Sequence, residues 1–369
     1  MLYLKEFIKN NPLFWEESLS NEPYHLNIKR EDGYCIFNYN QIKSDFSNPI
    51  VCEARGIILD ELDGFKVVCR GFDKFFNFGE THAASLDWTS AKITEKIDGS
   101  IIKLWFSERL NRIMWSTNGT IYAERCPVMF PNDEIKTFGD MINKAIETDN
   151  RFTSFFENYN SDCTYIFEVV GPNNRVVIPY EEIKLYLLAA RYNITGKYFS
   201  IESIDLLKPK EYSQNFYYIS DIEDFLKLEN MNTYKHEGVV VSDYSGNRIK
   251  IKTQEYLRIH RLRGEAVPTD KRMMDLILNN ETSEFLTYFP EYKEQYDRLK
   301  KLYDSYLLKL DCLKHEFKNK TFESRKDLAL WAKTTISPNF IFALADGKID
   351  SSNNWCMTMG AEKLVELMK

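Results

Sequence analysis

The stretch Lys96-Ile97-Asp98-Gly99-Ser100 combines residue types that could carry out covalent chemistry. An unprotonated lysine amine can attack a phosphorus atom, but a free lysine titrates near ~10.4, so burial or neighbouring cations must lower its pKa. The nearby carboxylate could position a metal-bound water or a sugar hydroxyl, and the glycine would let the backbone approach a ligand closely. An exposed turn is the alternative interpretation of these five residues.

Four further segments carry charged residues that suit phosphate chemistry. They are Glu53-Ala54-Arg55-Gly56 upstream, and Ile166-Phe167-Glu168-Val169-Val170, His236-Glu237-Gly238-Val239-Val240-Val241 and Arg248-Ile249-Lys250-Ile251-Lys252-Thr253 downstream. In the second of them, a glutamate interrupts an apolar strand. Strand alternation puts Glu168 on the face opposite Phe167 and Val169, and that face is either solvated or part of a cleft.

The last segment reads as a strand with a row of cations. Alternation puts Ile249 and Ile251 on one face and the three cations of residues 248–252 on the other. A solvated strand face is the common explanation of such a row. Beside a lysine nucleophile, the same cations would bind phosphates and help to lower the pKa of that lysine.

Together these segments resemble motifs I, III, IV and V of the covalent nucleotidyltransferases, the polynucleotide ligases and mRNA capping enzymes. Other parts of the chain are similar to the phage RNA ligase 1 family, which repairs tRNA. They are residues 36–39, 53–56, 74–77, 170–178, 184–188 and 195–196, with a weaker likeness at 332–333 and 340–344. The resemblance is dense from about residue 36 to residue 256 and thin beyond.

The resemblance implies a set of site residues. The catalytic residues would be Lys96, Lys250 and Lys252. ATP would be bound by Arg55, Lys74, Lys96, Glu168, Lys250, Lys252 and Tyr39. Mg²⁺ or Mn²⁺ would be held by Asp98, Glu168 and Glu237, which could act through waters. The apolar residues of Val239-Val240 and Leu185-Tyr186 could sandwich the adenine, although ordinary strand packing explains them equally well.

The resemblance also implies an activity. Lys96 would take AMP from ATP, the AMP would move to an RNA 5′-phosphate, and a 3′-hydroxyl would then displace it. The RNA partner would be a tRNA with a broken anticodon loop, and the protein would act as a monomer. One departure from the family is the turn Thr117-Asn118-Gly119-Thr120, where Asn118 stands in place of a basic residue and puts one nucleotide contact in doubt.

Length, charge and periodicity bear on the organisation of the chain. Its 369 residues suit two domains, and the net charge of −7 does not exclude a nucleic-acid partner, since a local basic surface sets phosphate affinity. From Tyr256 onward the balance turns to +2, with 19 basic residues against 17 acidic ones, and a basic run (Arg258, His260, Arg261, Arg263) marks the junction. That run is either an exposed helix face or an RNA contact.

The fold class expected is α+β. Up to about Thr253, short β-branched and aromatic segments separated by turns predict antiparallel sheets, with flanking helices near 133–146 and 201–207. Beyond, the stripe Tyr292, Tyr296, Leu299, Tyr303, Tyr306, Leu310 and Leu313 predicts one long helix, and further helices are expected at 328–333 and 362–368. We therefore expect a nucleotidyltransferase domain over residues 1–256 and an all-helical RNA-specificity domain over 257–369.

Cysteine usage and hydropathy indicate a compartment. Seven scattered cysteines without a Cys-x-x-Cys pair favour a reducing compartment and disfavour a zinc site. No run of eighteen apolar residues occurs, and the N-terminus, which reads as a short amphipathic helix or strand, lacks a secretory h-region. The expected location is the cytoplasm, that of the host cell if the gene belongs to a phage, with no membrane partner.

Two other functions share some of these features. A capping guanylyltransferase has Lys-x-Asp-Gly but should carry an all-β OB-fold after the cation row, as should a DNA ligase. The helical periodicity of the C-terminal part disfavours both. A non-catalytic tRNA-binding protein with a decayed ligase domain is disfavoured because the lysine nucleophile, both glutamates and both motif V lysines are present.

Overall fold

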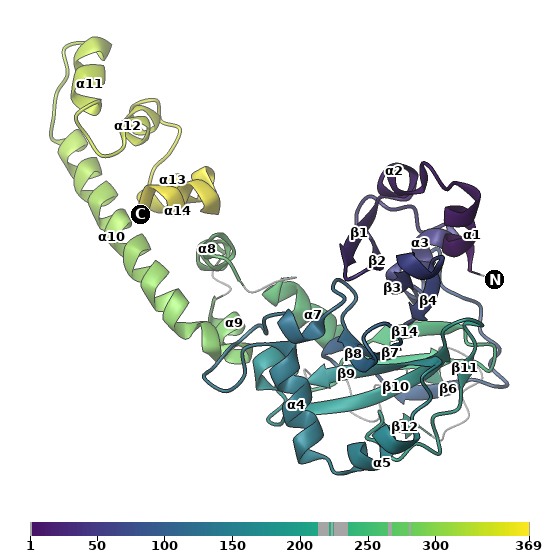
Figure 1. The fold of residues 1–369 in the computed structure, drawn as a ribbon. Helices are drawn as coiled ribbons and strands as arrows, with labels where there is room; N and C mark the ends of the chain where they lie inside the picture. Colours follow the sequence, from purple (N-terminus) through teal and green to yellow (C-terminus); the bar gives the residue numbers. More distant parts are fainter. Residues whose placement is uncertain are drawn as a thin grey trace. The chain divides into compact units, whose positions relative to one another are not determined.

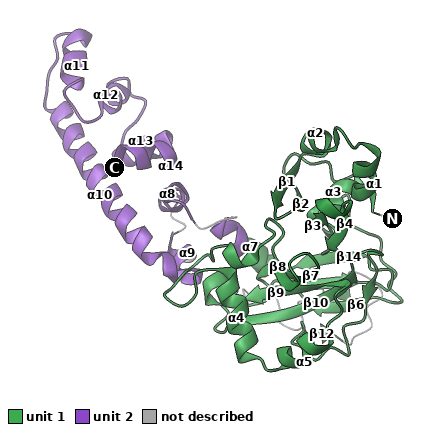
Figure 2. Cartoon of the chain, viewed as in Figure 1, with its two compact units in different colours: residues 1–258 green, residues 259–369 purple. Residues whose placement is uncertain are grey.

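The computed structural model describes residues 2–212, 221–222, 224, 235–264, 268–279 and 282–368. The chain divides into two compact units, Met1–Arg258 and Ile259–Lys369, which are coloured separately in Figure 2. The division falls inside helix α7 (Gln254–Arg263), whereas the change in sequence periodicity placed the boundary after Tyr256.

Unit 1 is built on three sheets (Figure 1). The first has the strand order β1 (Leu26–Glu31), β2 (Tyr34–Tyr39), β3 (Arg55–Asp60), β4 (Lys66–Cys69). The second has the order β11 (Tyr198–Phe199), β10 (Lys184–Tyr192), β9 (Cys163–Val170), β7 (Ser100–Ser107), β8 (Arg112–Ser116). The third has the order β12 (Glu211–Tyr212), β6 (Lys92–Glu95), β13 (Gly238–Ser242), β14 (Arg248–Lys252), β5 (Phe76–Asn77).

The expected α+β class with antiparallel sheets is confirmed. All strand pairs of the first two sheets run antiparallel. The third sheet has one exception, because β5 pairs with β14 in parallel. This pairing brings the segment that follows Lys74 to the edge of the cation-bearing strand.

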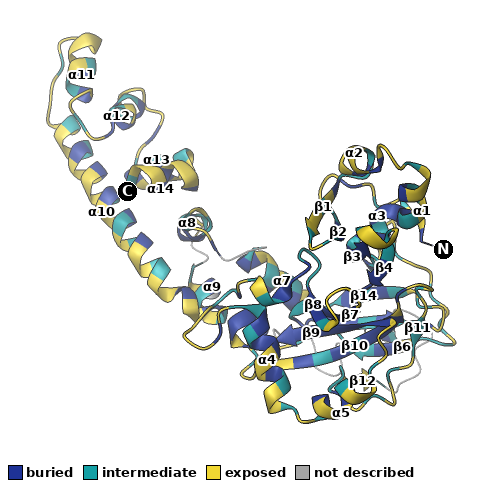
Figure 3. Ribbon diagram, viewed as in Figure 1, coloured by how far each residue is buried: buried dark blue, intermediate teal, exposed yellow. Residues whose placement is uncertain are grey.

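Apolar side chains on opposite sheet faces build the layers of unit 1. Helices α1 (Tyr3–Asn10), α2 (Trp15–Ser20) and α3 (Pro49–Glu53) cover one face of the first sheet. The other face of that sheet packs on Trp105 and Met114 of the second sheet. Helices α4 (Phe138–Thr148) and α5 (Arg151–Asn158) close the far side of the second sheet. The second sheet is therefore covered on both faces, and β9 is buried along its whole length (Figure 3).

Local sequence explains where helices begin. Thr137 and Asp140 form a capping box at the start of α4, which overlaps the helical region expected at 133–146 but begins five residues later and ends two residues later. Residues 201–207, also expected to be helical, form turns instead, so that prediction is wrong. The segment is short and is followed by Pro209, and its apolar Leu206 packs against the core of the second sheet without needing helical spacing.

Unit 2 is helical throughout its described residues, as expected for the C-terminal part. Its elements are α8 (Asp270–Leu278), α9 (Thr282–Tyr288), α10 (Lys293–Lys318), α11 (Arg325–Ala332), α12 (Pro338–Ala345), α13 (Ser352–Met359) and α14 (Ala361–Met368). The predicted stripe is buried at Leu299, Tyr303, Tyr306, Leu310 and Leu313 of α10, against which α8, α12, α13 and α14 pack. None of the described helices of either unit is long and apolar enough to span a membrane.

Candidate active site

A cavity of about 1030 Å³ lies in unit 1. The second and third sheets contribute most of its lining. From the second sheet come Ile101, Glu168 and Leu188, and from the third come Thr94, Val240 and Arg248, with Lys96 directly after β6. On the third sheet these residues alternate with Ile93, Val239, Val241 and Ile249, which form the core on its opposite face. The cation row therefore belongs to the cavity-facing side of its strand.

Lys96 and Lys252 share one buried carboxylate. The Lys96 ammonium donates a hydrogen bond to Oε2 of Glu237 at 2.6 Å, and the Lys252 ammonium lies 2.9 Å from Oε1. The side chain of Glu237 is 3% exposed and that of Lys96 is 21% exposed. Strand register explains the meeting, because Gly238 stands opposite Lys252 and the Lys96 amide donates to the Gly238 carbonyl. Three expected site residues are thus brought together from three separate segments.

The electrostatics of this cluster favour a charged lysine. Burial lowers the pKa of Lys96, but the carboxylates of Glu237 and Glu168 outweigh it and raise the pKa above its ordinary value. Burial likewise raises the pKa of Glu237, and Lys96 and Lys252 outweigh it in the opposite direction. The expectation that neighbouring cations lower the pKa of Lys96 is therefore wrong for the protein without bound nucleotide.

Asp98 is occupied by hydrogen bonds within the protein. Its Oδ2 accepts from the backbone amides of Val177 and Ile178, each at 2.8 Å, and its Oδ1 accepts from the Tyr256 hydroxyl at 2.7 Å. The Asp98 amide in turn donates to the Tyr180 hydroxyl at 3.3 Å. Asp98 is thus placed to fix the nucleophile's loop against the start of α7. Tyr256 was not among the site residues expected from the sequence. The sequence feature that could have indicated it is its position four residues after Lys252.

Glu168 lies beside the nucleophile's loop and lines the cavity. A Cβ on Gly99 would lie 2.3 Å from the Val169 carbonyl oxygen and 3.1 Å from Cγ of Glu168, so only glycine permits this approach. Burial raises the pKa of Glu168 to about 8, although Lys96 opposes the shift. Among the described residues the side chain of Glu168 makes no hydrogen bond or ion pair.

Three further cations gather near the third sheet without a carboxylate partner among the described residues. They are Arg55, Lys74 and Lys250. The ammonium of Lys250 and the guanidinium of Arg55 both lie over the ring of Phe75, at 5.8 Å and 5.1 Å from its centroid. Burial lowers the pKa of Lys250 to about 8, and Arg55 and Lys96 act in the same direction. Such a group of uncompensated cations favours a polyanionic ligand.

Tyr39, the last of the expected ATP-binding residues, lies beneath Lys74. The Lys74 ammonium is 5.0 Å from the Tyr39 ring centroid and 4.9 Å from that of Phe46. These aromatic faces stabilise the cation while leaving its N–H groups available to a ligand. In the structure Tyr39 therefore supports the Lys74 side chain.

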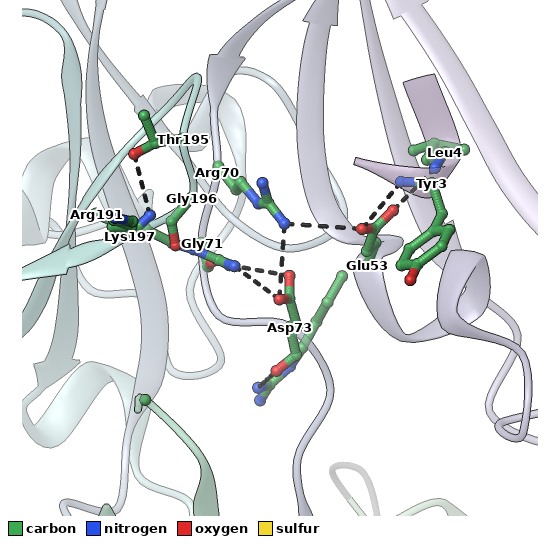
Figure 4. Close-up of polar contacts among 12 residues, drawn as sticks. Tyr3, Leu4, Glu53, Arg70, Gly71, Asp73, Arg191, Thr195, Gly196 and Lys197 are labelled. Carbon is green, nitrogen blue, oxygen red and sulfur yellow. Dashed lines mark hydrogen bonds and ion pairs between the residues drawn. The ribbon is translucent and has the colours of Figure 1, made fainter. Parts of the chain in front are cut away.

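A buried arginine cluster holds the loop that carries Lys74 (Figure 4). Arg191 donates to both carboxylate oxygens of Asp73, at 2.9 Å and 2.7 Å. Arg70 lies 3.9 Å from Asp73 and 3.7 Å from Glu53. The Asp73 carbonyl also accepts from the Arg55 guanidinium at 3.4 Å. Asp73 thereby ties Arg55 to the loop before Lys74, and sequence reasoning missed it although it directly precedes Lys74.

Glu53 extends the same network to the N-terminus. Its carboxylate accepts from the backbone amides of Tyr3 at 3.2 Å and Leu4 at 2.8 Å, which begin helix α1 (Figure 4). Carboxylates near a helix N-terminus satisfy amides that lack a helical partner. The glutamate of the Glu53-Ala54-Arg55-Gly56 segment is thus an anchor for α1.

We expect Asp73→Asn to weaken the use of ATP by loosening Arg55 and Lys74. Loss of the charge removes the two-pronged pairing with Arg191, and the ATP concentration for half-maximal formation of an enzyme–nucleotide adduct should rise about tenfold. The free energy of unfolding should fall by only about 1–2 kcal/mol, because Asp73 is partly exposed. Adduct formation at varied ATP measures this, with exposed Asp63→Asn as control. An unchanged ATP requirement beside a lower stability would restrict Asp73 to a structural role.

The three carboxylates expected to hold a metal are not gathered into one site. Among the described residues, no group of three or more His, Cys, Asp or Glu side chains is arranged to hold a metal ion. Both oxygens of Asp98 accept hydrogen bonds within the protein, and both oxygens of Glu237 contact lysine ammonium groups. Glu168 does fit a divalent cation, since it is buried, lines the cavity and has no side-chain hydrogen-bond partner among the described residues. A cation that keeps several waters suits such a sparse donor set.

Of the residues expected around the adenine, some line the cavity and others are buried in the core. Val240 lines the cavity, whereas Val239 and Leu185 are buried in the cores behind the two sheets. The bulge in β10 next to Leu187 instead brings Leu188 and Ala189 to the cavity. Asn118 also lines the cavity, in a turn that the Thr117 hydroxyl closes by accepting from the amides of Gly119 and Thr120.

Comparison with known proteins identifies the family. A model of the family described as RNA ligase matches residues 53–256, which is more than half of the chain. The chain belongs to this RNA ligase family, so the resemblance to the phage RNA ligase 1 family and the enzyme class expected from it are confirmed.

Two sequence relatives and one solved structure are similar to this chain. A protein of Autographa californica nuclear polyhedrosis virus, proposed to be a bifunctional polynucleotide kinase/RNA ligase, is 33% identical over 74% of this chain. This chain spans 40% of the length of that relative. The RNA ligase of Rhodothermus phage RM378 is 27% identical over 98% of this chain and 97% of its own. The solved structure of an archaeal ATP-dependent RNA ligase is 17% identical, with a TM-score of 0.47 over 77% of this chain and 74% of its own.

Proposed function

We propose that this protein is an ATP-dependent RNA ligase that joins a 5′-phosphate to a 3′-hydroxyl through lysyl–AMP and RNA-adenylate intermediates. The observation that carries the proposal is the position of Lys96. It lies at a cavity beside a carboxylate shared with Lys252, next to three cations without a carboxylate partner among the described residues. These cations fit a nucleoside triphosphate, and the phosphate chemistry agrees with the RNA ligase family.

The first step would form the enzyme adduct. Neutral Lys96 attacks the α-phosphorus of ATP, a P–N bond forms, the bond to the β-phosphate oxygen breaks and pyrophosphate leaves, while the nitrogen gives up a proton to solvent. Because Glu237 raises the pKa of Lys96, the amine must lose its proton before attack. Arg55 and Lys74 would hold the outer phosphates, and Lys250 and Lys252 the α-phosphate, where charge builds up.

The second and third steps would consume the adduct. An oxygen of the RNA 5′-phosphate attacks the phosphorus of lysyl–AMP, and the P–N bond breaks as Lys96 regains a proton. The 3′-hydroxyl then attacks the 5′-phosphate, loses its proton and expels AMP, which leaves a phosphodiester. Mg²⁺ or Mn²⁺, when held by Glu168, would neutralise charge on the phosphate oxygens. We propose that Asp98 contributes by positioning the loop of the nucleophile.

A joining assay tests this function. The full chain should convert a 5′-phosphorylated, 3′-hydroxyl RNA into ligated or circular product with ATP and Mg²⁺, and it should form no product with GTP. A labelled GTP adduct without joining would favour the capping guanylyltransferase. RNA binding without any adduct would favour the non-catalytic tRNA-binding protein.

We further propose that unit 2 selects the RNA and that the preferred substrate is a tRNA broken in its anticodon loop. The nucleotidyl-transfer segments all end by Lys252, and the charge balance turns positive beyond Tyr256. The basic run at the junction offers fewer RNA contacts than its composition suggests. Arg258 pairs with Glu255, and Arg263 is 2% exposed beside the Phe289 ring, so Arg263 does not serve as an RNA contact. Of the three arginines in that run, Arg261 alone is both exposed and without an acidic partner in the part of the chain that the structure describes.

Removing unit 2 should separate RNA selection from nucleotide chemistry. A chain ending at Arg263 is expected to form lysyl–AMP and to join simple single-stranded RNA, with its preference for nicked tRNA lost. Competition between nicked tRNA and a plain oligonucleotide measures this, and the melting curve of the shortened chain is the control for its fold. Equal preference in the shortened and full chains would place RNA selection in unit 1.

The cellular compartment is proposed from the state of the cysteine thiols. All seven cysteines are free, as in proteins of a reducing compartment such as the cytoplasm. We propose that the protein acts there as a monomer.

A further inference from the structure

The cation row of β14 extends beyond the lysines assigned to ATP. Arg248, Lys250 and Lys252 share the cavity-facing side of the strand, and successive residues on one side are roughly 6.6 Å apart. Arg248 stands opposite Ser242, which in turn stands opposite Lys92 on β6. All three of these residues line the cavity. The row at Arg248 is therefore a second polar level of the cavity, displaced from Lys250 by two strand residues.

Aromatic rings hold the Arg248 guanidinium. Its central carbon lies 3.9 Å from the Tyr198 ring centroid and 4.9 Å from that of Phe72. The Nη1 group donates to the Gly246 carbonyl at 2.9 Å. Rings that stack on a guanidinium leave its in-plane N–H groups free, and a planar fork of donors matches the oxygens of a phosphate.

Arg248 makes no direct ion pair among the described residues. By contrast, Lys252 pairs with Glu237, and Lys92 pairs with Glu202 at 2.5 Å. Burial lowers the pKa of Arg248, and nearby Arg191 acts in the same direction, whereas Tyr198, Asp73 and Asp243 oppose the shift without reversing it. A buried cation of this kind gains stability from an anionic ligand.

We propose that Arg248 binds a backbone phosphate of the RNA strand whose 5′ end is activated. This inference rests on the proposed function. In that function Arg55, Lys74 and Lys250 are matched by the phosphates of ATP, which leaves Arg248 to a second anion. In that function RNA reacts only after lysyl–AMP has formed. Arg248 thus acts on the steps that use RNA and not on the step that uses ATP.

Arg248→Met tests the assignment in the full chain. Formation of lysyl–AMP should keep its rate and its ATP requirement within about twofold. The KM for a 5′-phosphorylated RNA should rise about tenfold, the order expected for a lost charge-assisted hydrogen bond. The salt dependence of RNA binding should become shallower by about 0.7–1 in the log–log slope. Arg248→Lys, which keeps the charge without the planar fork, should give an intermediate KM.

Lys92→Met is the matched control, because Lys92 belongs to the same row of the cavity but is already paired with a carboxylate. It should leave the KM for RNA within about twofold. Wild-type RNA kinetics in Arg248→Met would overturn the inference, and so would a raised ATP requirement with unchanged RNA kinetics, which would make Arg248 an ATP-phosphate contact. If the wild-type protein forms no lysyl–AMP, the proposed function itself fails, and the two failures are thereby distinguished.

Discussion

Replacing Lys96 by arginine is expected to abolish transfer of label from ATP to the protein, with a loss of about 10³-fold or more. Arginine keeps a positive charge beside Glu237, but its guanidinium stays protonated and is a poor nucleophile. Lys96→Ala should fail equally because it has no amine. The measurement is protein labelling by α-labelled ATP after denaturing electrophoresis.

Two controls separate loss of chemistry from loss of fold. Lys92→Arg changes a lysine four residues earlier, at an exposed site, and should label like the wild type. Lys96→Arg should still seal an RNA that is supplied already adenylated, because that step needs no lysine nucleophile. Normal adduct yield in either Lys96 variant would remove Lys96 from the mechanism.

The second large effect is expected from Glu237→Gln. Glu237 holds Lys96 and Lys252 together, so the maximal rate of adduct formation should fall by about 10²-fold or more. The pH dependence should change as well. The carboxylate stabilises protonated Lys96 and raises its pKa, so a neutral amide should lower that pKa. The rise of rate with pH should therefore move to lower pH in the variant.

Single-turnover adduct formation across a pH series measures both parts of this prediction. Glu202→Gln, which also removes a carboxylate paired with a lysine but at an exposed position, is the matched control and should leave both rate and profile unchanged. A lower rate with an unmoved pH profile would show that Glu237 does not set the protonation of Lys96.

The sequence predicted those features of the site that lie within a single motif. Alternation placed Glu168 opposite Phe167 and Val169, and it separated Ile249 and Ile251 from the cations of β14, as the buried cores show. The periodicity of four and three predicted the long helix α10. These features depend on neighbours in sequence, whose geometry is fixed by the backbone period.

The remaining features depend on partners distant in sequence. The raised pKa of Lys96 follows from the nearby carboxylates of Glu237 and Glu168, and sheet register decides that Glu237 meets Lys96. The hydrogen bonds to Asp98 come from residues about 80 and 158 positions away, so nothing local revealed that its oxygens are occupied. The same holds for Asp73, whose partner Arg191 lies on β10. A motif states which groups are present, but only the fold shows which of them are already satisfied.

Mapping the adduct on the wild-type protein tests the central claim most directly. The pKa values of two lysines near the cavity are shifted in opposite directions. Neighbouring carboxylates raise the pKa of Lys96, whereas burial lowers that of Lys250 to about 8. Judged by pKa alone, Lys250 is therefore the better nucleophile. Judged by its position in the loop of Asp98 and Gly99, Lys96 is the expected nucleophile. After incubation with ATP and Mg²⁺, proteolysis and mass spectrometry should find one AMP, on the peptide that contains Lys96. An AMP found on Lys250, or no adduct in a protein that still joins RNA, would contradict the account.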